Sequence, residues 1–203
     1  MTKYIIGVVM FVIVAVGAYY AWQAMSGSIV PPPPPPPSAP VTSTYATSTF
    51  SLVYPSAYSV DEEYTYDAFK GKPVAGVKFT APASISEGTN LSSDTGVSVE
   101  WLPRANKCTG DMYVLPNVKA ISLTVGSTTY SVATTSEAGA GNRYEEQVFA
   151  IPGSKPCTAV RYFIHYMAIE NFEPGAVTEF DRGALLREFD SIRNSLQLNA
   201  QTI

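Results

Sequence analysis

The pattern of apolar and polar residues divides the chain into three parts. Residues 4–22, YIIGVVMFVIVAVGAYYAW, contain no charged side chain. At about 1.5 Å per residue, a helix of this length matches the roughly 30 Å hydrocarbon core of a bilayer. Residues 26–44 are rich in proline, serine and threonine, whereas residues 45–203 alternate between apolar and polar positions. We therefore predict a transmembrane anchor over residues 1–25, a linker, and a β-rich domain.

The apolar run favours a retained anchor over a cleaved signal peptide. It exceeds the roughly 7 to 15 residues of a cleavable apolar region, although cleavage near residues 24–26 stays open as the alternative. Tyr19, Tyr20 and Trp22 gather at its far end, where amphipathic rings favour the headgroup level. Because Lys3 precedes the run, we expect a single-pass protein of the cell membrane with a cytoplasmic N-terminus and an extracytoplasmic C-terminal domain.

The seven consecutive prolines at residues 31–37 predict a stiff spacer. Proline fixes φ and lacks an N–H, so the run adopts polyproline II and spans about 22 Å. The Ser/Thr-rich continuation adds looser reach. The alternative is a PxxP ligand for an SH3-like or WW-like module, which we disfavour because those modules act mainly in the cytosol.

Period-two alternation predicts several strands in the third part. Apolar side chains alternate with mostly polar ones in residues 50–54, 77–79 and 97–101, so each segment is predicted to bury one face and to expose the other to solvent. ISLTVGSTTYSV, residues 121–132, predicts a hairpin with the Gly-Ser pair as its turn. RYEEQVFAI follows the glycine-rich loop EAGAGN, and AVRYFIHYMAI at residues 159–169 is apolar on both faces, as in a central covered strand.

A C-terminal helix supplies a covering layer for this sheet. Asp181 is its expected N-cap, and Phe180 can pack on the first apolar residue of the helix. The sequence therefore predicts an α+β fold in which an antiparallel sheet is sandwiched with helices. The apolar stripe of the helix consists of Leu185, Phe189, Ile192 and Leu196.

Cys108 and Cys157 each lie in a turn-like stretch ahead of a strand. An even cysteine count in a domain outside the membrane favours a disulfide. Closing a loop of about 50 residues would stabilise the fold by about 4 kcal/mol. Two free thiols or half of a metal site are the alternatives, and the second lacks both a CxxC spacing and more than one histidine.

Charge disfavours nucleic acid and anionic membrane surfaces as partners. The chain has no charged residue between Lys3 and Asp61, and the part beyond holds 12 basic and 17 acidic residues, a net charge of −5. It contains no Lys/Arg cluster that could neutralise phosphates.

His165 and Arg161 form the candidate polar site, because they lie four residues apart on one predicted strand face. No G-x-S-x-G, no S-x-x-K and no nearby cysteine accompanies the histidine, so we assign no catalytic residue and favour a structural role. A single histidine cannot form the usual His-rich zinc sites. We expect no metal and no cofactor.

The acidic residues give two weaker candidates. Asp61, Glu63 and Asp67 share one face of a predicted strand and could bind Ca²⁺, but a strand spaces them about 7 Å apart, which favours a solvated face. Glu145 and Glu146 resemble a glycosidase carboxylate pair. Adjacent strand residues point to opposite faces, so they cannot flank one bond.

Two segments resemble PsbP-like domains. FSLVYPSAY (residues 50–58) resembles their first strand, which ends in an aromatic-Pro turn, and FDSIRNSLQL (residues 189–198) resembles the stripe of their final helix. The resemblance covers about residues 45–199 and departs at Tyr58, where tryptophan is common. It extends to small membrane-anchored proteins of reduced-genome bacteria and implies an α/β/α sandwich. Photosynthetic members assist a manganese and calcium cluster, but none of their functional residues can be matched here.

We therefore expect a membrane-tethered extracytoplasmic binding or accessory domain that is not an enzyme: it either binds a protein, a glycan or another envelope component, or serves as an accessory subunit of an envelope or secretion complex. The alternative is an extracytoplasmic hydrolase with a site assembled around His165. Rigid tyrosines could provide a recognition surface, although most are expected to be half-buried in the sheet. These tyrosines are Tyr45, Tyr58, Tyr64, Tyr66, Tyr113 and Tyr130.

Overall fold

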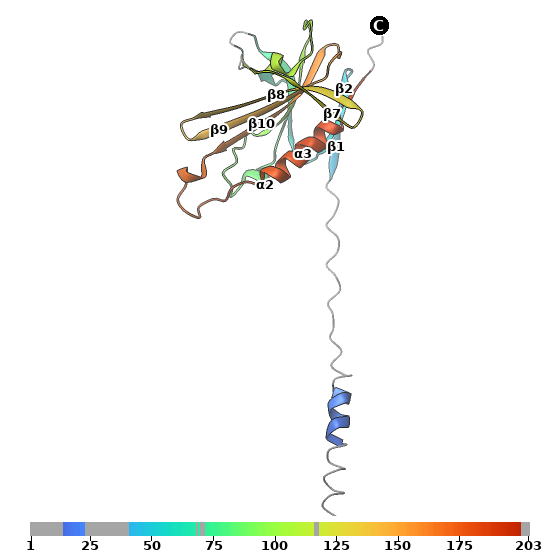
Figure 1. The fold of residues 1–203 in the computed structure, drawn as a ribbon, viewed down its shortest axis with the longest axis vertical. Helices are drawn as coiled ribbons and strands as arrows, with labels where there is room; N and C mark the ends of the chain where they lie inside the picture. The colour runs from blue at the N-terminus through green and yellow to red at the C-terminus, as the bar shows by residue number, and fades with distance from the viewer. Residues whose placement is uncertain (1–13, 23–40, 68, 70–71, 116–117, 200–203) are drawn as a thin grey trace, which may run out of the picture. The chain divides into compact units, whose positions relative to one another are not determined.

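The computed structural model describes residues 14–22, 41–67, 69, 72–115 and 118–199 (Figure 1). The chain divides into one unit that ends at Ala39 and a second that starts at Pro40. In the first unit, residues 14–22 are helical. No helix among the described residues combines the length and the apolar character needed to cross a bilayer. The rest of the predicted anchor and the proline run lie outside the described residues.

An antiparallel sheet of eight strands forms the framework of the second unit (Figure 1). This confirms the prediction of an antiparallel α+β domain. Its strands are β3 (Ser59–Asp61), β4 (Thr65–Tyr66), β5 (Val74–Thr80), β6 (Gly96–Leu102), β7 (Ile121–Val125), β8 (Thr128–Gly139), β9 (Asn142–Ala150) and β10 (Cys157–Met167).

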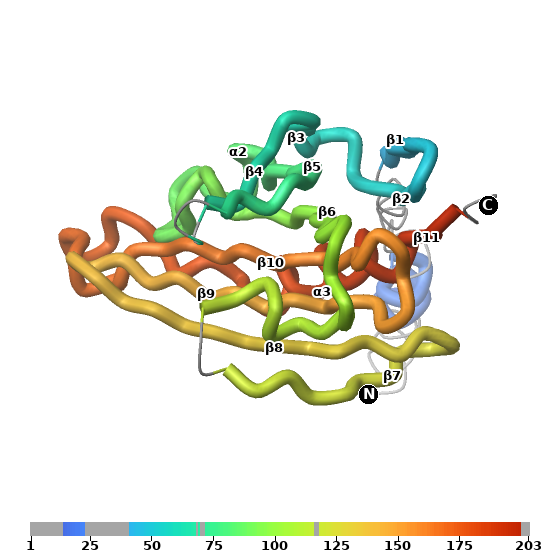
Figure 2. The backbone as a smooth tube through the Cα atoms, turned by 90° about the horizontal axis from the view of Figure 1, so that it is seen from above, coloured from blue at the N-terminus to red at the C-terminus, as the bar shows by residue number. Residues whose placement is uncertain are grey.

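The strand order is β3-β5-β6-β10-β9-β8-β7, with β4 also paired to β5. The central position of β10 confirms the expectation from its apolar sequence, since it pairs with β6 on one side and with β9 on the other. Figure 2 shows β8, β9 and β10 running side by side over most of their length. Two short helical segments, α2 (Ala83–Ser86) and η1 (Gly110–Tyr113), lie in connections between strands, and a third, η2 (Ile169–Asn171), follows β10.

A second layer covers one face of this sheet, which we call the core face. It contains helix α3 (Arg182–Asn194) and a three-stranded sheet of β1 (Thr42–Ala46), β2 (Phe50–Pro55) and β11 (Gln197–Leu198). Strand β1 begins inside the stretch that we assigned to the linker.

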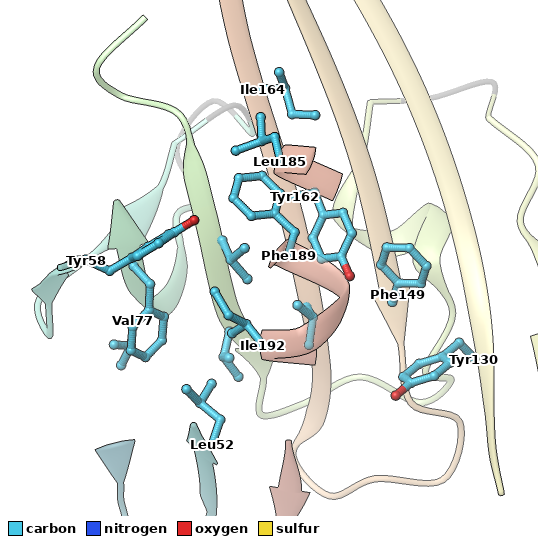
Figure 3. Packing of buried hydrophobic residues seen from close by; sticks show 14 of the residues in the cluster. Leu52, Tyr58, Val77, Tyr130, Phe149, Tyr162, Ile164, Leu185, Phe189 and Ile192 are labelled. Atoms are coloured by element: carbon cyan, nitrogen blue, oxygen red, sulfur yellow. The ribbon is translucent and has the colours of Figure 1, made fainter. Parts of the chain in front are cut away.

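Helix α3 begins where the sequence predicts it, but it ends at Asn194, so Leu196 of the predicted stripe lies beyond the helix. The Oδ1 atom of Asp181 accepts a hydrogen bond of 2.8 Å from the backbone N–H of Ala184, which confirms the N-cap. Leu185, Phe189 and Ile192 are at most 2% exposed. Figure 3 shows Phe189 lying next to Tyr162 of β10, and the two ring centroids are 5.3 Å apart.

Removing the N-cap tests how much the hydrogen bond between Asp181 and Ala184 contributes to the stability of the domain. We expect Asp181→Ala to lower the free energy of unfolding by about 1 kcal/mol, because the N–H of Ala184 loses its acceptor. Urea unfolding followed by circular dichroism measures this loss. Glu173→Ala, at an exposed position outside the helix, serves as the control and should change stability by less than about 0.5 kcal/mol. Equal stability of the two variants would contradict the prediction.

The predicted hairpin of β7 and β8 is confirmed, with Gly126 in its turn at a φ of 59°. Because β7 is the outermost strand, its apolar residues Ile121 and Leu123 remain 66% and 39% exposed. The loop EAGAGN is shorter than predicted. Strand β8 runs to Gly139, and Ala140 and Gly141 alone form the turn to β9.

The acidic run VDEEYTYD is not a continuous strand, so the predicted shared face of Asp61, Glu63 and Asp67 is wrong. Strand β3 ends at Asp61, and the Oδ1 atom of Asp61 accepts a hydrogen bond of 3.0 Å from the backbone N–H of Glu63. A short acidic side chain competes in this way with strand pairing and favours a turn. All three carboxylates are exposed.

The disulfide between Cys108 and Cys157 is present, with the two Cα atoms 5.2 Å apart. It joins the segment before η1 to the first residue of β10. The hydroxyl of Tyr113 donates a hydrogen bond of 2.6 Å to the carbonyl oxygen of Cys157. The disulfide and this bond hold η1 close to the start of the central strand.

Candidate functional site

The face of the large sheet opposite α3 carries polar and aromatic side chains beside a second buried apolar cluster that includes Ala133, Val148 and Ala159, and we call it the polar face. Alternation along β10 places Arg161, Phe163 and His165 on this face, whereas Tyr162 and Ile164 belong to the core face. The pairing registers arrange the polar face in three successive rows. These rows are Lys78, Ser98 and Arg161; Phe163, Glu146 and Thr135; and His165, Tyr144 and Glu137.

Arg161 is fully buried on the polar face and holds two carboxylates. Its Nε and Nη2 atoms donate to the two carboxylate oxygens of Glu100 at 2.8 and 2.9 Å. Its Nη1 atom donates to Glu146, and Nη2 also donates to the carbonyl oxygen of Tyr113 at 2.6 Å. Burial alone would lower the pKa of Arg161, but Glu100 and Glu146 raise it above its ordinary value. The guanidinium is therefore a permanent cation that organises the interior.

This ion pair corrects the expected exposure of β6. We predicted that Ser98 and Glu100 would face water, but they are 3% and 0% exposed. The Ser98 hydroxyl donates to Oε1 of Glu100 at 2.7 Å, and Arg161 neutralises the carboxylate. A buried charge is tolerated when it is paired and hydrogen-bonded in this way.

The ring of Tyr66, in β4, packs against the charged group formed by Arg161, Glu100 and Glu146, which we call the ion cluster. The Cζ atom of Arg161 lies 3.5 Å from the centroid of the Tyr66 ring, and the Tyr66 hydroxyl donates to Oε1 of Glu146 at 2.9 Å. Burial raises the pKa of Tyr66, so its hydroxyl stays protonated and continues to donate. Glu146 is thus fixed by both a cation and a phenol.

His165 has its own set of partners. Its Nδ1 atom is 2.8 Å from Oδ1 of Asp94, its Nε2 atom is 3.0 Å from Oδ1 of Asn142, and its ring stacks on Tyr144 with centroids 4.4 Å apart. The His165 side chain is 17% exposed. Among the described residues, no hydroxyl or thiol hydrogen-bonds to either ring nitrogen. The ring is held in place on both edges, without an adjacent nucleophile in the part of the chain that the structure describes.

Arg161 and His165 share one face of β10 as predicted, but they do not form one site. They lie about 13 Å apart along the strand, with Phe163 between them on the same face. Arg161 belongs to the buried ion cluster, whereas His165 lies nearer the end of the strand. The sequence identified the correct face, but it did not identify the residue in the middle.

A cavity of about 290 Å³ opens on the polar face between these two residues. We call it the aromatic groove. Three rings and two carboxylates contribute to it, and neither the guanidinium of Arg161 nor the imidazole of His165 lines it. Its lining residues are Tyr66, Thr135, Glu137, Tyr144, Glu146 and Phe163.

The side chains of the groove are held by neighbours outside it. The Nζ atom of Lys78 lies 5.3 Å from the centroid of the Phe163 ring and 5.6 Å from that of Tyr64. Burial lowers the pKa of Lys78, while Asp94 opposes that shift. Tyr144 is stacked on His165. The groove therefore has a preformed shape.

Two larger hollows, of about 640 and 680 Å³, lie elsewhere on the domain. The first lies beside β7 and the second beside the disulfide, and neither contains a residue of the ion cluster or His165. Within the described residues, no group of three or more His, Cys, Asp and Glu side chains is arranged to hold a metal ion. The aromatic groove thus remains the hollow that adjoins both predicted site residues.

No protein family model and no curated protein matches the chain. Among solved structures, a protein of Bacteroides thetaiotaomicron matches with a TM-score of 0.41 and 11% sequence identity. The match covers 76% of this chain and 46% of that one, so the chain spans less than half the length of that protein. At this level the similarity supports no conclusion about function.

Proposed function

We propose that the second unit is a non-enzymatic binding domain and that the aromatic groove is its ligand site. The observation that carries this proposal is a preformed hollow in which three rings adjoin two carboxylates. Ligand sites are commonly concave, largely preformed and lined by aromatic side chains with a few fixed polar groups. Such an arrangement of rings and polar groups is sufficient for a binding site, whereas a hydrolase site would also need a nucleophile or an activated water.

We further propose that the ligand is a glycan of the cell envelope. The rings of Tyr144 and Phe163 can stack against the apolar face of a sugar, and Glu137 and Thr135 can hydrogen-bond to its hydroxyls. Glu146 is already held by Arg161 and Tyr66, so it presents its oxygens in a fixed position. Fixed groups lower the entropy cost of binding.

We infer an extracytoplasmic location with the domain tethered by its N-terminal segment. Support comes from the uncharged apolar run at residues 4–22 and from the disulfide, since disulfides persist mainly in oxidising compartments. We also infer a PsbP-like relationship and its α/β/α sandwich. Its support is a second strand that ends at Pro55 and a final helix whose Phe189 and Ile192 pack on an antiparallel sheet.

Truncating the groove tests the binding proposal. We expect Phe163→Ala to weaken binding of an oligosaccharide roughly tenfold, because one stacking surface is removed. The full chain in detergent micelles would be titrated calorimetrically with chitotetraose, cellotetraose and mannotetraose as probes. Phe172→Ala, a half-buried phenylalanine outside the groove, is the matched control and should bind as the unchanged protein does.

Two results would contradict the proposal. Binding that survives Phe163→Ala unchanged would place the ligand elsewhere. Failure of the unchanged protein to bind any of the three probes would argue against a glycan.

The hydrolase built around His165 is the second candidate, because Asp94 hydrogen-bonds to its imidazole at 2.8 Å. A neighbouring carboxylate can orient a histidine that acts as a general base. Hydrolysis of p-nitrophenyl acetate by the full chain measures such an activity. A rate that disappears in His165→Ala, while the thermal unfolding midpoint is unchanged, would favour the enzyme over the binding domain.

A further inference from the structure

Strand β8 is much longer than the strand that covers its outer edge. Strand β8 has 12 residues, and β7 pairs only with Thr128–Val132. Figure 2 shows β7 ending well short of the far end of β8. On this side, residues 134–138 have no paired strand among the described residues, and we call them the open edge.

The two hairpin turns determine which backbone groups point outward. Gly139 and Asn142 flank the two-residue turn between β8 and β9, and residues in that position exchange both backbone hydrogen bonds. Odd-numbered residues of β8 therefore bond to β9, and even-numbered residues point away from it. The turn between Val125 and Thr128 gives the same parity, because it assigns the even-numbered residues to β7.

The backbone N–H and C=O groups of Thr134, Ser136 and Ala138 consequently face outward. No hydrogen bond from any other described residue reaches these groups, and all three residues are exposed. Natural sheets usually protect such edges with lysine, proline or a bulge. The open edge has none of these, and its one charged residue, Glu137, turns its side chain into the aromatic groove.

We propose that the open edge pairs with the open edge of a second copy of this chain. The two strands run antiparallel about a two-fold axis at Ser136, so Ser136 lies opposite Ser136 of the second copy and Thr134 lies opposite Ala138. Each outward backbone group then meets a complementary one. The same surface is used by both copies, so the association stops at a dimer.

Charge selects this register over its neighbour. With the axis at Ser136, Glu137 lies opposite Thr135 of the second copy. A shift of the axis by one residue to Glu137 would place Glu137 opposite Glu137 of the second copy, and like charges directly opposite each other are unfavourable. A shift in the other direction, to Thr135, would place Ala138 of the incoming strand opposite Val132, whose outer side β7 already occupies. In the favoured register the incoming strand reaches its turn at Ala140. This residue lies opposite Val132 of the other copy, where pairing with β7 begins. The open edge is therefore long enough to pair with residues 134–138 of the second copy without displacing β7.

Cysteine cross-linking tests the axis. Opposed residues in a hydrogen-bonded pair have Cα atoms about 5.5 Å apart, which is within the range for a disulfide. Ser136→Cys in the full chain, in native membranes under mild oxidation, should give roughly tenfold more covalent dimer than Ser127→Cys. Ser127 is the matched control, because it is exposed in the turn between β7 and β8 but lies away from the axis.

Mixed variants test the register. Thr135→Cys mixed with Glu137→Cys should cross-link more than either variant alone, because these residues oppose each other across the axis. Ser136→Lys should lower the dimer fraction of the purified full chain in sedimentation while its unfolding midpoint stays unchanged, since an edge lysine blocks pairing. Equal cross-linking of Ser136→Cys and Ser127→Cys would overturn the proposal. Cross-linking of Ser136→Cys to a different protein instead of to itself would also overturn it.

Discussion

Replacing Arg161 with methionine is expected to lower the free energy of unfolding by about 3 to 5 kcal/mol. The change leaves the carboxylate of Glu100, which is 0% exposed, without its cation. Glu146 and the carbonyl oxygen of Tyr113 lose a donor at the same time. A buried charge without a partner costs far more than the ion pair contributes, so this is among the largest single effects available in the domain.

Urea unfolding of the full chain measures this loss. Arg143→Met is the matched control, because Arg143 is an exposed arginine whose Nη1 atom bonds only the neighbouring carbonyl oxygen of Asn142; it should cost less than about 0.5 kcal/mol. Adding Glu100→Gln to Arg161→Met should restore part of the loss, since the uncompensated charge is then removed. A loss below about 1 kcal/mol for Arg161→Met would show that water or rearrangement compensates Glu100.

Removing the disulfide is expected to have a comparable effect. The double variant Cys108→Ser and Cys157→Ser should lose about 4 kcal/mol, because the bridge closes a loop with a sequence separation of 49 and restricts the unfolded chain. Urea unfolding again measures the change. The unchanged protein treated with a reductant is the internal comparison and should unfold at nearly the same midpoint as the double variant. A double variant as stable as the oxidised protein would contradict the loop-entropy argument.

The two effects should not be independent. Tyr113 binds the first residue of β10 through its hydroxyl and Arg161 through its carbonyl, so the bridged segment supports the ion cluster directly. Residues that share a partner show coupling energies of about 0.5 to 3 kcal/mol. We therefore expect the combined variant to lose less than the sum of the separate losses.

The features that were predictable from the sequence are those fixed by neighbouring residues. Alternation identified β2, which has one buried face, and a run that is apolar on both faces identified the central strand β10. A capping aspartate and a stripe with helical spacing identified α3 and its first residues. Adjacent glutamates pointed to opposite faces as expected: Glu145 meets Arg182 on the core side, whereas Glu146 meets Arg161.

The features that were missed depend on distant parts of the chain. Alternation gives the face of a residue but not what covers that face, so it could not show that Glu100 and Arg161, 61 residues apart, are buried together. One signal was present: each strand carries a single, opposite charge within an apolar run, in VSVEWL and AVRYFI. Such a pair in two apolar strands predicts a buried ion pair.

The aromatic groove was harder to predict because it depends on register. Phe163 was on the same face as the predicted residues, but Tyr144 joins it only through the pairing of β9 with β10. The overlong loop predicted at EAGAGN obscured that pairing. Asp94 reaches His165 from a segment 71 residues earlier in the chain, for which no local pattern gives a signal.

Strand β10 begins at Cys157 and also carries Arg161 and Phe163. Formation of the sulfur bridge therefore fixes the strand that contributes Phe163 to the proposed binding surface. In newly made chains with reduced thiols, we expect β10 and the segment that contains Cys108 to be less rigidly positioned. If the domain is exported as we propose, oxidation after export acts as a maturation step, and the proposed groove becomes competent to bind its ligand only at the protein's destination.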